Sequence, residues 1–144
     1  MTSNLKEILL KDKNKALYID NKTENTLDDI AQALKNNIKI IHFFIKNLSD
    51  KENLELAFKI RQLCSIYDSL FIINSRVDIA KITNADGVCL NKNDIDVKYA
   101  KDILGNDKIF CYFDDGTSYN NDFDYICSFE NSTKKDYKFI RLIR

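Results

Sequence analysis

Four cysteines and one histidine are the residues of this chain that could hold a transition metal through sulfur or imidazole nitrogen. The cysteines form no Cys-x-x-Cys pair and are dispersed along the chain, at Cys64, Cys89, Cys111 and Cys127. Three of them lie inside apolar runs, which is typical of buried, reduced thiols that pack as small hydrophobic side chains. A zinc site usually has paired ligands and more than one histidine, and His42 is alone. The spacing therefore favours packing over metal–thiolate chemistry.

Composition limits the classes of protein to consider. The chain has 144 residues, of which 44% are hydrophobic and 31% charged, so we expect a single folded domain over residues 1–144. Its 22 basic and 22 acidic residues cancel, so it lacks the basic excess typical of nucleic-acid binding. No apolar run approaches a membrane span, and the start has no signal-peptide pattern. We expect a cytoplasmic protein that binds neither nucleic acid nor membranes.

Short apolar runs alternate with amphipathic segments, and this alternation predicts a repeated β–α unit. Strands are predicted at 15–20, 39–45, 70–74, 86–90, 108–113, 124–128 and 138–143. Helices are predicted at 26–35, 49–67, 77–82 and 97–104, whereas 116–121 reads as a weak helix or a loop. Thr26 and Ser49 each precede an acidic residue by three positions, as in a helix capping box, and Gly105 is placed to end the last helix.

The alternation suits either an open doubly wound sheet or a closed β/α barrel, and periodicity does not separate the two. Complete eight-stranded barrels rarely have fewer than about 200 residues, so length alone favours the open sheet.

Four segments, however, resemble the thiamine phosphate synthase/TenI family. They are 41–49 (IHFFIKNLS), 72–80 (IINSRVDIA), 84–94 (NADGVCLNKND) and 133–136 (TKKD), in the family's order and near its spacing. The resemblance implies an incomplete (β/α) TIM-type barrel with six or seven mainly parallel strands, from which the last one or two β/α units are missing.

The resemblance also implies a chemistry. The family's synthase joins a hydroxymethylpyrimidine pyrophosphate to a thiazole phosphate and releases pyrophosphate, with Mg²⁺ and fixed cations holding the leaving group. Carried over by position, Lys46, Asn74 and Lys134 would bind phosphate groups, and Asp94 would be a ligand of Mg²⁺.

Other positions depart from the family pattern. Its glutamine and arginine are replaced by His42 and Phe44, its second Mg²⁺ carboxylate by Ser75, and a serine after the fifth strand by Phe113. We therefore assign no catalytic residue and treat these four as possible lining of the site. Losing one contact that strengthens in the transition state costs a factor of about 10²–10³.

Each of these residues also has a structural interpretation. Lys46 can be a solvated lysine at a strand end, and Asn74 and Asp94 can cap helices. His42, with apolar neighbours on both sides, is expected to be a hydrogen-bonded core histidine. Arg76 and Asp78 are expected to form a structural pair at the start of a helix.

Three functions follow as hypotheses. The first is a degenerate family member, a pseudoenzyme with weak or no synthase activity that binds a phosphorylated small molecule or regulates. The second is an active thiamine phosphate synthase, and the third is a structural or assembly protein without a ligand. Because an unclosed barrel exposes strand edges, we also expect a homo-oligomer or a partner that covers them.

Overall fold

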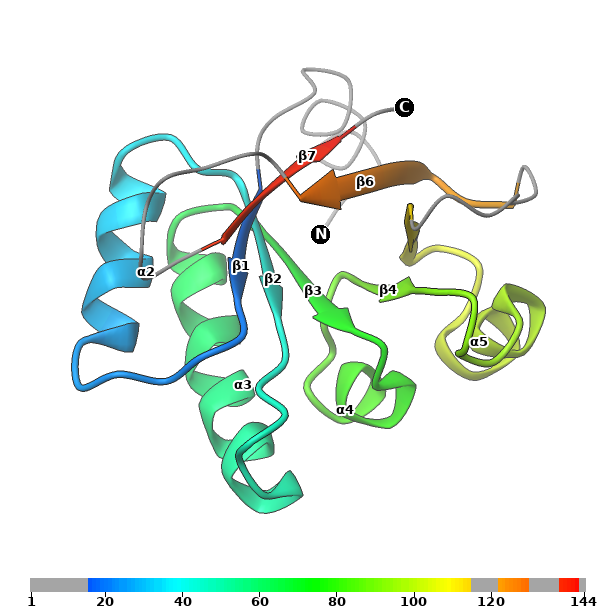
Figure 1. The fold of residues 1–144 in the computed structure, drawn as a ribbon, viewed down its shortest axis with the longest axis horizontal. Coiled ribbons are helices and arrows are strands. Elements are labelled where there is room, and N and C mark those ends of the chain that lie inside the picture. Colours follow the sequence, from blue (N-terminus) through cyan, green and yellow to red (C-terminus); the bar gives the residue numbers. More distant parts are fainter. Residues whose placement is uncertain (1–15, 115–121, 130–137, 143–144) are drawn as a thin grey trace.

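The chain folds into a small β/α barrel, shown in Figure 1. The computed structural model describes residues 16–114, 122–129 and 138–142, with side chains over 16–114 and 122–128. The described strands are β1 (Ala16–Ile19), β2 (Ile40–Phe43), β3 (Leu70–Asn74), β4 (Gly87–Leu90), β5 (Ile109–Phe113), β6 (Tyr125–Phe129) and β7 (Lys138–Leu142). The described helices are α2 (Thr26–Lys35), α3 (Asp50–Ile66), α4 (Val77–Ile82) and α5 (Val97–Leu104).

The strands form one ring in sequence order. Over the described ranges, β1 to β6 pair in parallel with their neighbours, and β7 pairs antiparallel with both β6 and β1. The prediction of a barrel with six or seven mainly parallel strands is confirmed, and the open sheet favoured by length alone is wrong. Because β7 lies between β6 and β1, the expectation of exposed strand edges is also wrong.

The predicted elements are present within a residue or two over the described residues, and the capping of α3 is confirmed. The Ser49 side chain accepts from the Glu52 N–H at 3.1 Å, and Glu52 accepts from the Ser49 N–H at 3.3 Å. Thr26, by contrast, is the first helical residue, and its hydroxyl donates to the Thr23 carbonyl at 3.0 Å instead of capping α2. Gly105 ends α5 with a φ of 93°, as its type predicts.

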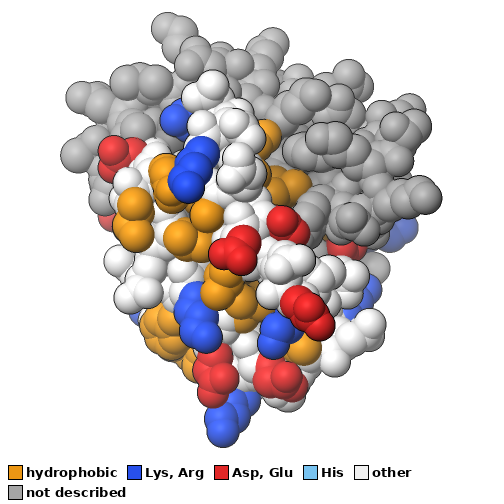
Figure 2. All heavy atoms as spheres, turned by 90° about the vertical axis from the view of Figure 1, so that its left-hand side faces the viewer, with side chains coloured by type: hydrophobic (Ala, Val, Ile, Leu, Met, Phe, Trp, Pro, Cys, Tyr) orange, Lys and Arg blue, Asp and Glu red, His pale blue; other side chains and the backbone are white. Residues whose placement is uncertain are grey.

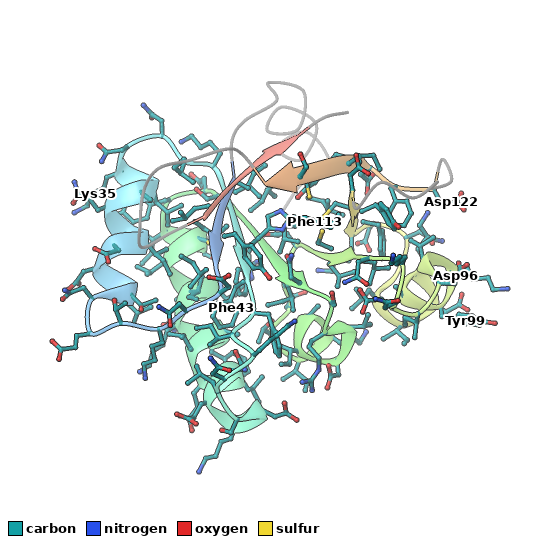
Figure 3. The ribbon with its side chains drawn as sticks, viewed as in Figure 1. Lys35, Phe43, Asp96, Tyr99, Phe113 and Asp122 are labelled. Atoms are coloured by element: carbon teal, nitrogen blue, oxygen red, sulfur yellow. The ribbon has the colours of Figure 1, made fainter. Side chains whose placement is uncertain are left out.

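Strand alternation divides the apolar side chains between two cores. The outer core packs the sheet against the helices and includes Phe43, Phe71 and Phe110. The inner core fills the barrel and includes Ile72, Cys111 and Tyr125 from β3, β5 and β6. Of the two phenylalanines labelled in Figure 3, Phe43 belongs to the outer core, and the partly buried Phe113 packs against the inner one.

Two aspartates tie neighbouring strands together at the amino ends of β4 and β6. The Asp86 carboxylate accepts from the Phe71 N–H at 2.8 Å, and the Asp124 carboxylate accepts from the Phe110 N–H at 2.8 Å. Burial raises the pKa of Asp86. A side chain at Gly87 is excluded, since its Cβ would lie 2.0 Å from the Ile109 carbonyl oxygen. Residues at this end of a barrel mainly provide stability.

The surface agrees with the balanced charge of the sequence. The face seen in Figure 2 carries basic and acidic side chains interspersed with apolar ones. Among the described residues, no helix combines the length and hydrophobicity that crossing a membrane requires.

Candidate functional site

A cavity of about 900 Å³ lies where the parallel strands β1 to β5 reach their carboxyl ends. This is the end at which barrels of this class bind ligands, because the loops after the strands converge there. The cavity is lined by Tyr18, Asp20, Phe44, Lys46, Asn47, Asn74, Ser75, Arg76, Cys89, Leu90, Asn91, Asn93, Asp94 and Phe113. It therefore brings together six of the eight residues that the sequence nominated.

Lys46 lies in the loop after β2, and a buried asparagine fixes that loop. Asn53 of α3 accepts from the Ile45 N–H at 3.1 Å and donates to the Ile45 carbonyl at 2.7 Å. It also donates to the Leu48 carbonyl at 3.4 Å, so it holds the backbone on both sides of Lys46. The lysine side chain is exposed and lines the cavity. This arrangement presents a cation on a rigid loop, suited to binding an anion.

Asn74 ends β3 at the floor of the cavity and is held from below. Its Oδ1 accepts from His42 Nδ1 at 2.7 Å, and its side chain also bonds to the Tyr18 hydroxyl. His42 itself is fully buried, lies outside the cavity lining, and pairs through Nε2 with the Tyr125 hydroxyl at 2.8 Å. Burial lowers the pKa of His42, so its imidazole is neutral at pH 7. His42 is thus a hydrogen-bonded core residue that orients Asn74.

Asp94 lies in the loop between β4 and α5. One carboxylate oxygen accepts from the Asn91 N–H at 2.8 Å, and the Asp94 N–H donates to the Asn91 carbonyl at 3.1 Å. The helix cap of α5 is instead Asp96, whose carboxylate accepts from the Lys98 N–H at 3.0 Å. Asp94 therefore does not cap α5, and it faces the same cavity as Lys46 and Asn74.

Three of the four residues that depart from the family pattern lie at the same cavity. Phe44, Ser75 and Phe113 all line the cavity. Ser75 has a φ of 74°, in the left-handed region that costs a serine about 1 kcal/mol. Its N–H and hydroxyl both donate to the Cys89 carbonyl, at 3.0 and 3.4 Å. Ser75 thus contributes a neutral group where the resemblance predicts a carboxylate.

The predicted pair of Arg76 and Asp78 is confirmed. Two guanidinium nitrogens bond to the Asp78 carboxylate at 2.9 and 2.8 Å, and a third bonds to Asp50 at 2.7 Å. The hydrogen bonds from Arg76 lower the pKa of Asp78. The guanidinium also lies 5.8 Å from the centre of the Phe44 ring. Because two carboxylates neutralise it, Arg76 supplies less positive charge to the cavity than its position suggests.

Lys134, predicted to bind phosphate, lies outside the described residues, as does the whole segment 133–136. The segment 116–121, predicted as a weak helix or loop, also lies outside them.

The sequence reasoning did not nominate the other lining residues, among them Tyr18 and Asp20. These two stand at the end of β1, and the family segments begin only at residue 41. The signal that could have found them is their position after a buried strand, at the end where all parallel strands of a barrel place functional groups. Burial raises the pKa of Tyr18 to about 12, so its phenol stays protonated.

The donor set of the cavity fits Mg²⁺. This ion takes oxygen ligands and is usually held by one or two carboxylates together with substrate phosphates. Asp94 and Asp20 supply carboxylates, and Asn74 supplies an amide at the floor. Asp94 is the residue that would hold the ion, since one of its oxygens is taken by the Asn91 N–H and the other is left for a ligand.

Fold and site together define a class: a β/α barrel with a polar cavity, lined by a lysine, carboxylates and amides, at the carboxyl ends of its strands. The model of the family described as thiamine monophosphate synthase matches residues 16–137. The chain belongs to this family.

Similar proteins and a solved structure support membership of the same family. The chain is similar to a thiamine-phosphate synthase of Prochlorococcus marinus subsp. pastoris, 41% identical over 112 residues, covering 78% of this chain and 30% of that protein. A thiamine-phosphate synthase of Prochlorococcus marinus strain AS9601 is 37% identical over 92% of this chain and 40% of its own length. Thiamine phosphate pyrophosphorylase from Pyrococcus furiosus superposes with a TM-score of 0.63 at 31% identity, covering 73% of this chain and 52% of that one. The chain thus spans about half or less of these proteins.

Proposed function

We propose that the cavity binds the pyrophosphate group of a small organic substrate together with Mg²⁺, and that the chain has weak thiamine phosphate synthase activity. The observation that carries the proposal is the convergence of Lys46, Asn74 and Asp94 on one cavity at the carboxyl ends of the strands. The three come from different loops and strand ends, and each matches a position of the family's pyrophosphate and metal site.

The residues of the cavity have separate roles in this proposal. Lys46 binds the pyrophosphate as a point charge, and the Asn74 side chain is held in one orientation by His42. Asp94 would hold Mg²⁺, which would supply positive charge to the leaving pyrophosphate. The aromatic rings of Phe44 and Phe113 line the cavity and offer apolar surface to a flat ring system such as a pyrimidine.

The weakness of the proposed activity follows from two substitutions. Phe44 stands where the family has an arginine, and Ser75 where it has a carboxylate. An arginine offers a fork of donors to phosphate, which a phenyl ring does not replace, and a serine hydroxyl does not replace a carboxylate as a ligand of Mg²⁺. Loss of even one such contact reduces turnover by about 10²–10³-fold.

The proposal is tested by calorimetric titration with Mg²⁺ and either pyrophosphate or hydroxymethylpyrimidine pyrophosphate. We expect Mg²⁺-dependent binding that Lys46→Ala weakens at least roughly tenfold, the scale of one charge-assisted contact. Lys81→Ala is the matched control, since Lys81 is an exposed lysine in the last turn of α4 and does not line the cavity. Absence of heat with both ligands, or equal loss in both variants, contradicts the proposal.

A fully active synthase is the second candidate, and the names of the relatives favour it. An assay of thiamine phosphate formation from the two phosphorylated substrates distinguishes the candidates. Turnover comparable with that of a full-length relative assayed in parallel supports the second, and turnover lower by two or more orders of magnitude supports the first. We also propose that the protein acts in the cytosol, where its four free cysteines would stay reduced.

A further inference from the structure

The interior of the barrel, beneath the cavity, holds three cysteines that the proposed function does not use, beside the histidine that orients Asn74. Cys89, Cys111 and Cys127 come from β4, β5 and β6, and His42 comes from β2. All four side chains are at most 1% exposed. Strand register explains the cluster, because Cys89 pairs directly with Cys111 in the sheet.

Three of the ligand atoms lie close enough to share one ion, and Cys127 adjoins them. One imidazole nitrogen of His42 and the sulfurs of Cys89 and Cys111 all lie within 4.8 Å of one another. The sulfurs of Cys89 and Cys127 are 3.8 Å apart, and Cys127 also bonds to the Cys111 thiol. In a tetrahedral site with zinc–sulfur bonds of about 2.3 Å, neighbouring sulfurs lie ~3.8 Å apart.

We propose that Cys89, Cys111, Cys127 and His42 form a buried site for a thiophilic metal ion of the zinc type. Three cysteines and one histidine are a common ligand set of structural zinc sites. Thiolate ligands disfavour Mg²⁺ and Ca²⁺, which prefer oxygen, so this site is chemically distinct from the carboxylate-lined cavity above it.

The histidine is already arranged for this role. Asn74 Oδ1 accepts the Nδ1 proton of His42, so Nε2 carries the lone pair that a metal needs. Nε2 now accepts from the Tyr125 hydroxyl at 2.8 Å, and that hydroxyl must turn away when an ion binds. The Cys111 sulfur, already a hydrogen-bond partner of Tyr125, offers the alternative acceptor.

The cluster adjoins the cavity. Cys89 belongs both to the cavity lining and to the cluster, so this is the side from which an ion would enter. Binding displaces the three thiol protons to solvent, which makes affinity rise with pH.

The first test uses the unmodified protein, reduced with a phosphine under anaerobic conditions. Titration with Co²⁺ as a spectroscopic probe should give one equivalent bound, with thiolate-to-cobalt charge-transfer absorption and intense visible bands of a tetrahedral ion. Zn²⁺ should then displace the cobalt, bleach these bands and raise the thermal unfolding midpoint. Absence of a charge-transfer band, or zinc binding at no defined stoichiometry, overturns the proposal.

The second test uses cysteine substitutions to show where the ion binds. Cys89→Ser and Cys111→Ser should each abolish or weaken cobalt binding at least tenfold, whereas Cys64→Ser should keep it. Cys64 is a matched control because it is equally buried but is a residue of α3 and packs in the outer core. Circular dichroism establishes that each variant is folded, and cadmium NMR of the unmodified protein counts thiolate ligands without any substitution. Retained binding in Cys89→Ser, or a cadmium shift typical of oxygen ligands, contradicts the site.

Discussion

At the scale of single residues, the site is supported from below by a neutral histidine. The bond from Nδ1 to Asn74 Oδ1 fixes both the tautomer of His42 and the orientation of the Asn74 amide. A residue that looks like a candidate base in the sequence thus acts as a positioning residue in the structure. Its burial also makes the fold sensitive to acid, because the two ring nitrogens bond to an amide oxygen and a phenol hydroxyl and not to a carboxylate that would stabilise an imidazolium.

We therefore expect stability to fall below about pH 6.5. Burial lowers the pKa of His42 in the folded state relative to its usual 6.5, so the unfolded state binds the proton more readily. The stabilisation is fully present above pH 6.5 and is lost as pH falls toward the folded-state pKa, by at most about 1.4 kcal/mol per pH unit. Urea unfolding at pH 6.5 and 5.5, in EDTA, measures this slope.

His42→Gln is the comparison for this prediction, since it cannot gain the proton and should show a shallower slope. Because His42 is the chain's only histidine, its imidazole resonances are unambiguous in NMR. A histidine resonance that titrates with a pKa of 6.5 or above would show the prediction to be wrong.

Ser75 offers a second test at this scale. Ser75→Asp restores a carboxylate at a position whose φ of 74° aspartate tolerates better than serine. With Mg²⁺, we expect roughly tenfold tighter pyrophosphate binding, because a further oxygen ligand becomes available. In EDTA, the added negative charge should weaken binding instead. Calorimetric titration under both conditions measures the reversal.

Ser75→Asn is the matched control, because asparagine has the same shape and tolerates the same backbone conformation without the charge. Equal effects of Asp and Asn, or an effect independent of Mg²⁺, would place residue 75 outside the ion's coordination.

At the scale of elements, periodicity and caps predicted most of what the structure shows. Runs such as 70–73 are apolar throughout because both faces of their strand are buried, and Ser49 caps α3 as its sequence pattern predicts. Thr26 failed as a cap because its hydroxyl bonds to Thr23 in the preceding turn, a local competition that spacing does not reveal.

The loop that carries Lys46 depends on a helix, and this dependence can be tested. Asn53→Ala leaves the Ile45 N–H and carbonyl without their partners, so we expect a loss of about 2–4 kcal/mol in the free energy of unfolding. The loop should also become less rigid, and pyrophosphate affinity should fall even where the variant is folded. Urea unfolding and calorimetry measure the two effects.

Lys59→Ala is the control on the same helix, since Lys59 is exposed and bonds to no part of the Lys46 loop. A destabilisation below about 1 kcal/mol in Asn53→Ala would mean that the loop keeps its conformation without the asparagine.

At the scale of the whole molecule, contacts between distant segments decided what the sequence could not predict. Spacing along the chain argued against a thiol cluster, yet strand register places Cys89 beside Cys111 and brings Cys127 within 3.8 Å of Cys89. Closure of the barrel could not be predicted from periodicity either. The pairing of β7 with both β1 and β6 depends on the geometry of the ring and leaves no periodic pattern in the sequence. The family segments predicted the barrel where chain length pointed to an open sheet.

Self-association of the chain stays a prediction, but it can no longer be argued from exposed strand edges. The ring provides no open edge among the described strands, so only apolar side chains on the helical surface argue for a partner. Those more than 40% exposed are Phe58, Ile66, Ile82, Ile95, Tyr99 and Ile103. They are dispersed over three helices and the loops beside them, which is ordinary for a monomer.

Removal of β7 should convert the ring into a sheet with two open edges. A chain ending at residue 137 leaves β1 and β6 each without one hydrogen-bonding neighbour, and unpaired edges are templates for pairing with another chain. We expect this variant to self-associate and to unfold at lower urea concentration than the full chain. Light scattering coupled to size exclusion measures the mass over a range of protein concentrations.

A chain ending at Leu142 is the control, because it retains all of β7 and therefore the closed ring. It should match the full chain in mass and stability. If the chain ending at residue 137 instead stays monomeric and equally stable, then pairing through β7 does not hold the barrel together, and the parallel strands β1 to β6 suffice with their helices. The comparison thus separates closure of the ring from the packing of the two cores as the source of the fold's stability.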